Sequence, residues 1–396
     1  MRRARARRGE PSTRREAVAL CLAVGIACGL LSALASGVRA DQPDATGGEA
    51  YEPGAAADKS GATDGEQPIF SVDSPVGPIE YFPARGLHVG RTGLRIGGFS
   101  TLELDREDGK PAEISLDSVN FLVSLDPIER LHLFAELEVG GLFSIDTDGF
   151  GVSSSPDLTV ERLYGDLSAN DALNLRVGKF QTPVGIWNQV PAEPFVWTAQ
   201  GPVTIEEGLD EFQTGVAVYG SFFPGVSTLS YWLYGQVVDS FDAPPDEHAV
   251  YRSAGGRLEY GSADAGWSVG GSVLGTVKHG EWSELGGLDA QLRIGPLELT
   301  SEALIQRGDI PHRNLWGAYL QGVYHLESLW TPLHGVYAVG RVEHFDKSGP
   351  RPVNLGDVGL AWLPVQWLNI KADYRFADRE TDQVRRGFFA SLSVLF

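Results

Sequence analysis

The sequence is poor in cysteine and in positive charge. Of its 396 residues only two are cysteines, Cys21 and Cys28, and both lie among the first 40 residues. A chain that loses this segment has no thiol, so no disulfide or cysteine metal site can organise it. Lys and Arg number 32 against 52 Asp and Glu, which gives a net charge of −20. Because nucleic acid demands a basic surface, the balance argues against a nucleic-acid partner.

The marks of an enzyme are also absent. The eight histidines are scattered, and no H-E-x-x-H motif or cysteine cluster could hold a metal. His334 and His344 share one expected strand, but both have the parity of its outer face. Gly270-Gly271-Ser272 lies inside an expected strand and lacks the following helix that a phosphate loop requires. We therefore expect no enzymatic activity, no metal and no cofactor.

The amino-terminal 40 residues have the composition of a secretory signal peptide. Seven arginines precede an apolar, alanine-rich run, and Val38-Arg39-Ala40 places small residues where a signal peptidase cleaves. The alternative is an uncleaved inner-membrane anchor, since the apolar run is long. Cleavage after Ala40 removes eight Arg and two Glu and changes the net charge from −20 to −26.

The segment 41–90 is expected to be a periplasmic leader. From Asp41 to about Gln67 it is rich in Gly, Ala, Asp and Glu, and its only aromatic residue is Tyr51. Such a composition buries too little apolar surface to order itself, so disorder is predicted there. The remainder, up to about residue 90, is interpreted as transitional between the leader and the domain that follows.

No stretch after the signal contains eighteen consecutive apolar residues, so no membrane-spanning helix is expected there. Instead, apolar and polar residues alternate. In Arg130–Ile145, for example, Leu131, Leu133 and Leu137 share one face, while Glu136 and Glu138 share the other. Segments of about ten residues with this period, separated by turns, are the signature of a transmembrane β-barrel.

About sixteen such segments can be counted. They begin near Leu94, Glu113, Arg130, Leu158, Ala172, Phe212, Val226, Val250, Gly266, Gly286, Leu297, Leu315, Leu333, Asn354, Gln366 and Gly387. Their connectors alternate between short turns, such as Asn170-Asp171, and mostly longer polar loops, such as Asp239–His248. Because outer-membrane barrels pair short periplasmic turns with longer external loops, residues 91–396 are predicted to form an all-β, antiparallel transmembrane barrel.

The last segment supports this prediction. Gly387–Phe396 reads GFFASLSVLF, and its alternate residues Phe388, Ala390, Leu392, Val394 and Phe396 make one apolar face. The pattern resembles the carboxy-terminal signature of Gram-negative outer-membrane barrels. We interpret Phe388, Leu392, Val394 and Phe396 as the signal that the barrel-assembly machinery reads.

The connector Gln181–Glu211 stands out from the others. It contains four prolines and the tryptophans Trp187 and Trp197, but no Lys or Arg. A loop this long inside a compact domain is usually functional or disordered, and its aromatic residues argue against disorder. We expect Trp187, Phe195 and Trp197 to pack against the barrel wall. The loop's carboxylates are the candidate pore constriction: Glu193, Glu206, Glu207, Asp210 and Glu211.

The segment Leu175–Asn188, LRVGKFQTPVGIWN, resembles part of the phosphate-selective porin O/P-like group, in which a Gly-Lys/Gln-Phe strand runs into Pro-x-Gly. The resemblance implies a passive diffusion channel, commonly a homotrimer, whose third external loop folds inward to narrow the pore. By strand count, Gln181–Glu211 is that third loop. Phosphate selectivity is not carried over, because the loop lacks the required cations.

Strand parity places eight cations on the wall of the expected lumen: Arg95, Arg162, Arg176, Arg257, Arg293, Arg341, Lys371 and Arg375. Opposite an acidic loop they would create a transverse field that orients dipolar solutes. The alternative is that they form ion pairs with carboxylates of the same wall, such as Glu302, Glu343 and Asp373.

The sequence therefore predicts a channel in the outer membrane of a Gram-negative bacterium. Its expected partners are outer-membrane lipid, small hydrophilic solutes and ions. The acidic loop favours a preference for cations, because carboxylates at a constriction select them. Two alternatives stay open: a substrate-specific channel for small anions or sugars, and a non-conducting structural or adhesive barrel.

Overall fold

The computed structural model describes residues 68–190, 192–236, 238, 252–278, 280–309, 314–347 and 351–396. The predicted signal peptide, the leader up to Gln67 and the loop Asp239–His248 lie outside the described residues. Within the described ranges, no helix has the length and apolar character needed to span a membrane.

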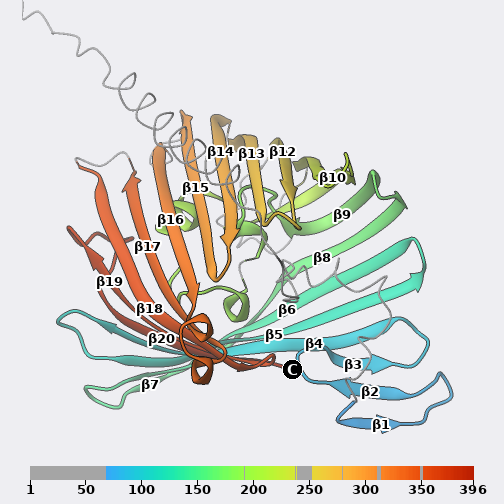
Figure 1. The fold of residues 1–396 in the computed structure, drawn as a ribbon, viewed down its shortest axis with the longest axis horizontal. Coiled ribbons are helices and arrows are strands. Elements are labelled where there is room, and N and C mark those ends of the chain that lie inside the picture. Colours follow the sequence, from blue (N-terminus) through green and yellow to red (C-terminus); the bar gives the residue numbers. More distant parts are fainter. Residues whose placement is uncertain are drawn as a thin grey trace, which may run out of the picture. The chain divides into compact units, whose positions relative to one another are not determined.

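Sixteen long strands form a continuous antiparallel sheet that closes on itself (Figure 1). They are β4 (Leu94–Glu107), β5 (Glu113–Ile128), β6 (Leu131–Asp146), β8 (Asp157–Asn170), β9 (Leu173–Gln181), β10 (Phe212–Phe222), β11 (Thr228–Gln236), β12 (Arg252–Ser262), β13 (Trp267–Lys278), β14 (Glu281–Ile294), β15 (Leu297–Gly308), β16 (Leu315–His325), β17 (Val336–Asp346), β18 (Val353–Val365), β19 (Leu368–Ala377) and β20 (Gly387–Leu395). A two-residue strand, β7 (Val152–Ser153), pairs with the last residues of β6.

Closure depends on the last strand. β20 pairs with β4 from Gly387↔Glu107 to Leu395↔Phe99, and Phe396 and Gly98 exchange both backbone hydrogen bonds at 2.8 Å. Because every long strand then has two partners, the wall leaves no free edge, which is the condition for strands to cross lipid. The predicted all-β barrel and its strand number are confirmed.

One strand boundary was misplaced by the sequence analysis. The strand expected to begin near Gly286 begins at Glu281, directly opposite Lys278 on β13. The connector is therefore a tight hairpin instead of a long external loop. Gly280, with φ +83°, allows that turn, since a two-residue hairpin requires a positive φ that glycine adopts without strain.

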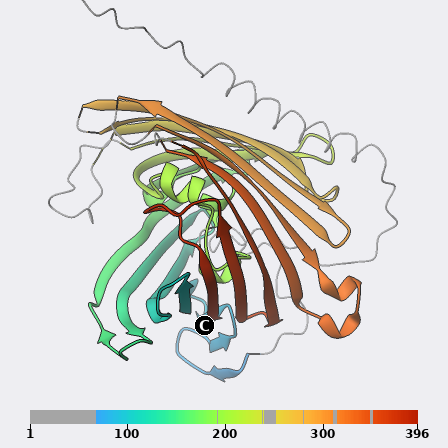
Figure 2. The same cartoon turned by 90° about the vertical axis from the view of Figure 1, so that its left-hand side faces the viewer.

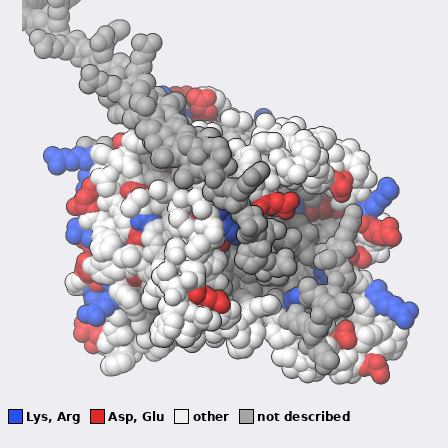
Figure 3. All heavy atoms as spheres, in the orientation of Figure 1, with Lys and Arg blue, Asp and Glu red and all other residues white. Residues whose placement is uncertain are grey.

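The two faces of the wall differ as the alternation indicated. Outward-facing Leu133, Leu163, Val177 and Leu233 are 39–61% exposed, whereas inward-facing Glu136 and its strand-paired partner Arg162 are buried. In Figure 3, many charged side chains gather toward the left and right edges of the view, and much of the described surface between them is uncharged. An apolar outer face around a closed barrel requires lipid as its surroundings.

Before the barrel, the segment that the sequence analysis left as transitional contains three short strands. They are β1 (Phe70–Val72), β2 (Ile79–Phe82) and β3 (Gly86–Val89), and they continue from β4 as an antiparallel sheet (Figure 1). They lie at the end of the barrel where the short turns gather, because β3 pairs with the first three residues of β4. Strands of three or four residues are too short to show a periodic signal.

Candidate functional site

The connector between β9 and β10, Thr182–Glu211, runs into the interior of the barrel and across it (Figure 2). It contains two 3₁₀ turns, η1 (Trp187–Gln189) and η2 (Glu193–Phe195), and one short helix, α2 (Val203–Gly208). Its two ends are tied together: Thr182 N donates to Glu211 O at 2.8 Å, and Asn188 Nδ2 donates to Thr182 O at 2.8 Å. The loop therefore leaves the wall at one narrow neck and reaches strands that lie far away in sequence.

The first anchor is Glu302 of β15, whose side chain points inward and is buried. Its carboxylate accepts the backbone N–H groups of Ile186 and Trp187, each at 2.8 Å. Gly185 permits this approach: its φ is +67°, and a Cβ there would lie 1.9 Å from Glu302 Oε2. Tyr319 of β16 donates its hydroxyl to the same carboxylate.

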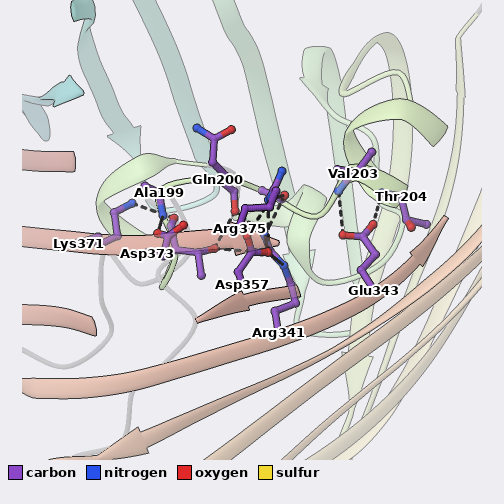
Figure 4. A network of polar contacts seen from close by, with 12 residues as sticks. Ala199, Gln200, Val203, Thr204, Arg341, Glu343, Asp357, Lys371, Asp373 and Arg375 are labelled. Atoms are coloured by element: carbon purple, nitrogen blue, oxygen red, sulfur yellow. Dashed lines mark hydrogen bonds and ion pairs between the residues drawn. The ribbon is translucent and has the colours of Figure 1, made fainter. Parts of the chain in front are cut away.

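The second anchor is Glu343 of β17. It accepts the backbone N–H groups of Val203 at 3.2 Å and Thr204 at 2.5 Å, which are the first residues of α2 (Figure 4). These N–H groups have no partner within a helix, and a carboxylate satisfies them while complementing the helix dipole. Gly317 on β16 leaves room for α2, because a Cβ there would lie 2.3 Å from Thr204 Oγ1.

The third anchor is a buried cluster of Arg341, Asp357 and Arg375 on β17, β18 and β19 (Figure 4). Asp357 accepts from Arg341 at 2.7 and 3.0 Å and from Arg375 at 2.7 Å. The remaining guanidinium donors go to the loop. Arg341 donates to Thr198 Oγ1 at 3.0 Å, Gln200 O at 2.6 Å and Gly201 O at 3.0 Å, and Arg375 donates to Gly201 O at 2.8 Å.

Three further residues of β19 hold the middle of the loop. Lys371 Nζ donates to both the carbonyl and the carboxylate of Glu193 at 2.8 Å. Asn369 Nδ2 donates to Pro194 O at 2.8 Å. Asp373 accepts the backbone N–H of Ala199 at 2.6 Å. The loop is thus tied along its length to the wall formed by β15–β19.

Apolar contacts add to these bonds. Val203 and Ile205 of α2 are buried in a cluster that includes Leu304 and Leu315 of the wall. The predicted packing residues lie at three places: Trp187 against that cluster, Trp197 against Tyr337 with ring centroids 4.7 Å apart, and Phe195 within η2, which packs against β4 and β20.

The loop carboxylates have different surroundings. Glu193 pairs with Lys371, and Glu207 pairs with Lys347, a residue that the sequence analysis did not single out. Burial raises the pKa of Glu206, although the nearby Arg375 and Arg341 oppose the shift. Asp210 accepts the Thr182 hydroxyl through its backbone carbonyl at 2.7 Å.

Glu211 stands at the neck of the loop. Burial, reinforced by the neighbouring carboxylates of Glu161 and Glu136, raises its pKa to about 7, while Arg162 opposes the shift and Glu138 adds to it. Its charge therefore changes within the physiological range of pH. The five expected constriction residues are spread along the loop, and no single ring of carboxylates brings them together.

All eight wall cations have a carboxylate within ion-pair distance. Five pair with carboxylates of the wall: Arg95 with Asp126, Arg162 with Glu136, Arg176 with Asp166, Arg257 with Asp289 and Arg293 with Glu298. The other three, Arg341, Lys371 and Arg375, pair with carboxylates and also bind the loop. This arrangement corresponds to the wall ion-pairing alternative. The guanidinium groups of Arg341 and Arg375 bind loop carbonyls and Asp357.

The anchoring roles of Glu302, Glu343, Asp357, Asn369 and Asp373 were not predicted from the sequence. The sequence did indicate that these five side chains point into the barrel, because each occupies a position that the alternation of its strand assigns to the inward face. The loop partners of Glu302, Glu343, Asp373 and Asn369, however, lie more than 100 positions away in the chain. Only the folded barrel brings the two sets together.

The terminal strand is placed as its alternation indicated. Phe388 and Leu392 are 40% and 39% exposed on the outer face, and Val394 pairs with Ser100 of β4 on the same face. The ring of Phe396 lies edge-on to Phe121 at 6.0 Å. Gly98 leaves space for that ring, because a Cβ there would lie 2.8 Å from it.

Comparison with known proteins identifies the fold through structure alone. No family model matches the sequence, and no curated protein matches it. Among solved structures, OmpF of Salmonella typhi, in complex with daunomycin, has a TM-score of 0.56 and 11% identity over 77% of this chain and 97% of that one. The trimer form of OmpT, an outer-membrane protein of Vibrio cholerae, has a TM-score of 0.53 and 12% identity over 76% and 99%.

A third structure is the outer-membrane channel DcaP of Acinetobacter baumannii, with a TM-score of 0.50 and 12% identity over 82% of this chain and 99% of that one. The chain therefore has the fold of outer-membrane porins. With its apolar outer face, this fold places the protein in the outer membrane of a Gram-negative bacterium.

Proposed function

We propose that this barrel is a porin, a passive diffusion channel for small hydrophilic solutes and ions, with no enzymatic activity. The loop Thr182–Glu211 is its constriction. The observation that carries the proposal is the anchoring of this loop, through Glu302, Glu343 and Arg341, to inward-facing residues of the wall. A loop held in this way narrows the lumen without closing the barrel at either rim.

A preference for cations follows from comparing the carboxylates and the cations of the wall and the loop. Each of the eight wall cations has a carboxylate within ion-pair distance, and the loop contributes five carboxylates and no cation. Two of these five are themselves paired with lysines, Glu193 with Lys371 and Glu207 with Lys347. The strands β4 and β6 also carry the inward-facing Glu103 and Glu138, both half-buried. An excess of carboxylates in a narrow, low-dielectric passage attracts cations and repels anions.

The test is the reversal potential of the purified protein in a planar bilayer under a KCl gradient. We expect K⁺ to permeate better than Cl⁻, and we expect the double variant Glu103→Gln, Glu138→Gln to reduce that preference. The matched control is Glu327→Gln, which removes an exposed carboxylate paired with His334 at the short-turn rim. Anion preference in the unmodified protein would overturn the acidic-constriction proposal.

One observation favours the non-conducting alternative. The loop buries Val184, Val203 and Ile205 against the wall in one apolar cluster, so part of the lumen is filled. The same bilayer measurement separates the two functions. Ohmic single-channel steps support the porin, and their absence in protein that migrates as a folded barrel supports the plugged barrel.

We also propose assembly as a homotrimer, supported by the fold shared with the trimer form of OmpT. The oligomeric mass in mild detergent tests it: a species of three copies is expected, and a monomer alone would refute it. The apolar alternation of the terminal strand supports recognition by the barrel-assembly machinery.

A further inference from the structure

The three short strands before the barrel make a small two-faced sheet with the start of β4. This element, Phe70–Ile96, forms a flap. On one face, Phe70 pairs with Tyr81, Tyr81 with Leu87, and Leu87 with Ile96. One row further along, Val72, Ile79, Val89 and Leu94 pair in the same order. Every member of this face is apolar or aromatic.

The opposite face is polar except for Phe82, whose ring centroid lies 5.0 Å from that of His88. Ser71 pairs with Glu80, Glu80 with His88, and His88 with Arg95. Arg95 in turn pairs with Ser124, a lumen-facing residue of β5, and bridges to Asp126. The polar face of the flap therefore continues the inner face of the barrel wall.

By the same register, the apolar face continues the outer face of the wall. Ile96 pairs with Val123 of β5, and the next outward residue of β5, Phe121, is 40% exposed toward lipid. The apolar side chains at the far edge of the flap are equally open, with Phe70 45% and Val72 58% exposed. Nothing among the described residues covers them.

We infer that the flap rests on the periplasmic leaflet of the outer membrane and that phospholipid covers its apolar face. The flap lies at the rim of the short turns, which is the periplasmic rim in such barrels. Phe70 and Tyr81, stacked at 5.8 Å, have the aromatic chemistry that concentrates where the acyl chains meet the headgroups.

The size of the face argues for lipid over a second copy of the chain. The strands β1, β2 and β3 and the first three residues of β4 together make a face of about 200 Å². This area is far below the roughly 800 Å² per partner of a stable protein interface. A lipid contact has no such threshold, because binding there scales with the apolar area inserted and adds to the existing belt of the barrel.

The test uses single cysteines carrying an environment-sensitive fluorophore, in the full chain with Cys21→Ser and Cys28→Ser. Val72→Cys reports the apolar face, and Ser71→Cys, its neighbour on the same strand, reports the polar face. Phe121→Cys in the lipid belt is the positive control. Each protein is reconstituted into vesicles of phosphatidylethanolamine and phosphatidylglycerol, with or without nitroxide-labelled phospholipid.

We expect nitroxide lipid to quench the Val72 label at least about twofold more strongly than the Ser71 label, and to a degree approaching the Phe121 label. Equal, weak quenching at positions 72 and 71, with strong quenching at 121, would overturn the inference. So would efficient disulfide crosslinking between copies of unlabelled Val72→Cys, which would identify a second chain as the cover. Heat-modifiable migration in gels confirms that each variant is folded before labelling.

Discussion

Replacing Arg341 with alanine should release the loop from its wall. The side chain is only 2% exposed and makes three hydrogen bonds to the loop, at 2.6, 3.0 and 3.0 Å. Arg375 keeps its bonds to Asp357 and to Gly201, so the carboxylate is not left alone. Two of these bonds come from the same nitrogen, Nη2, and we count them as one. Hydrogen bonds to a charged group contribute about 1.5 kcal/mol each at the low end of their range, so two of them give a loss of about 3 kcal/mol in docking free energy.

Such a loss raises the undocked fraction of the loop about a hundredfold, since each 1.4 kcal/mol is about a factor of ten. Accessibility of a buried loop residue measures that fraction. Ala199 is 7% exposed, so in an Ala199→Cys background a charged thiol reagent should react slowly, and Arg341→Ala should accelerate the reaction by about the same factor. Single-channel conductance should rise and become noisier.

The matched control is Arg293→Ala. That guanidinium is also paired, with Glu298 at 3.1 Å, but its side chain is 42% exposed and has no hydrogen bond or ion pair to the described residues of the loop. Exposed ion pairs contribute at most about 1 kcal/mol, so thiol reactivity at position 199 should not change. Equal reactivity and equal conductance in the Arg341→Ala and Arg293→Ala proteins would refute the reasoning that buried wall charges hold the loop.

Three further outcomes are expected. Gly185→Ala should loosen the part of the loop next to its neck, because alanine at φ +67° is strained by about 1 kcal/mol and its Cβ would collide with Glu302. Thiol accessibility in the loop measures the loosening, and unchanged accessibility would contradict this prediction. Cation preference should fall as pH drops from about 8 to about 6, because the pKa of Glu211 near 7 means that its charge is lost on acidification. Glu211→Gln should remove that step from the reversal potential, and a step that persists would assign it to another group. Phe396→Ala should lower the yield of heat-modifiable folded barrel, since its ring packs in the space left by Gly98; an unchanged yield would contradict this role.

The alternation of residues by itself determined the barrel. A strand that separates lipid from an aqueous lumen must carry apolar residues on one face and polar residues on the other, and Leu131, Leu133 and Leu137 against Glu136 and Glu138 show that requirement within one segment. Connector lengths then assigned the strand ends to the two rims, because short and mostly longer connectors alternate, with the tight hairpin between Lys278 and Glu281 as an exception. The barrel could be predicted from the sequence because lipid and water determine the residue pattern of each strand separately.

The tertiary structure decided what the charges do. Arg341 and Gly201 are 140 positions apart, as are Lys347 and Glu207, and no local pattern links them. Sequence parity indicated that Arg341 faces inward, but whether it faces an open lumen or a loop depends on where that loop lies. Closure of the barrel brings β17–β19 opposite the neck of the loop, so cations expected to line a passage hold the loop in place.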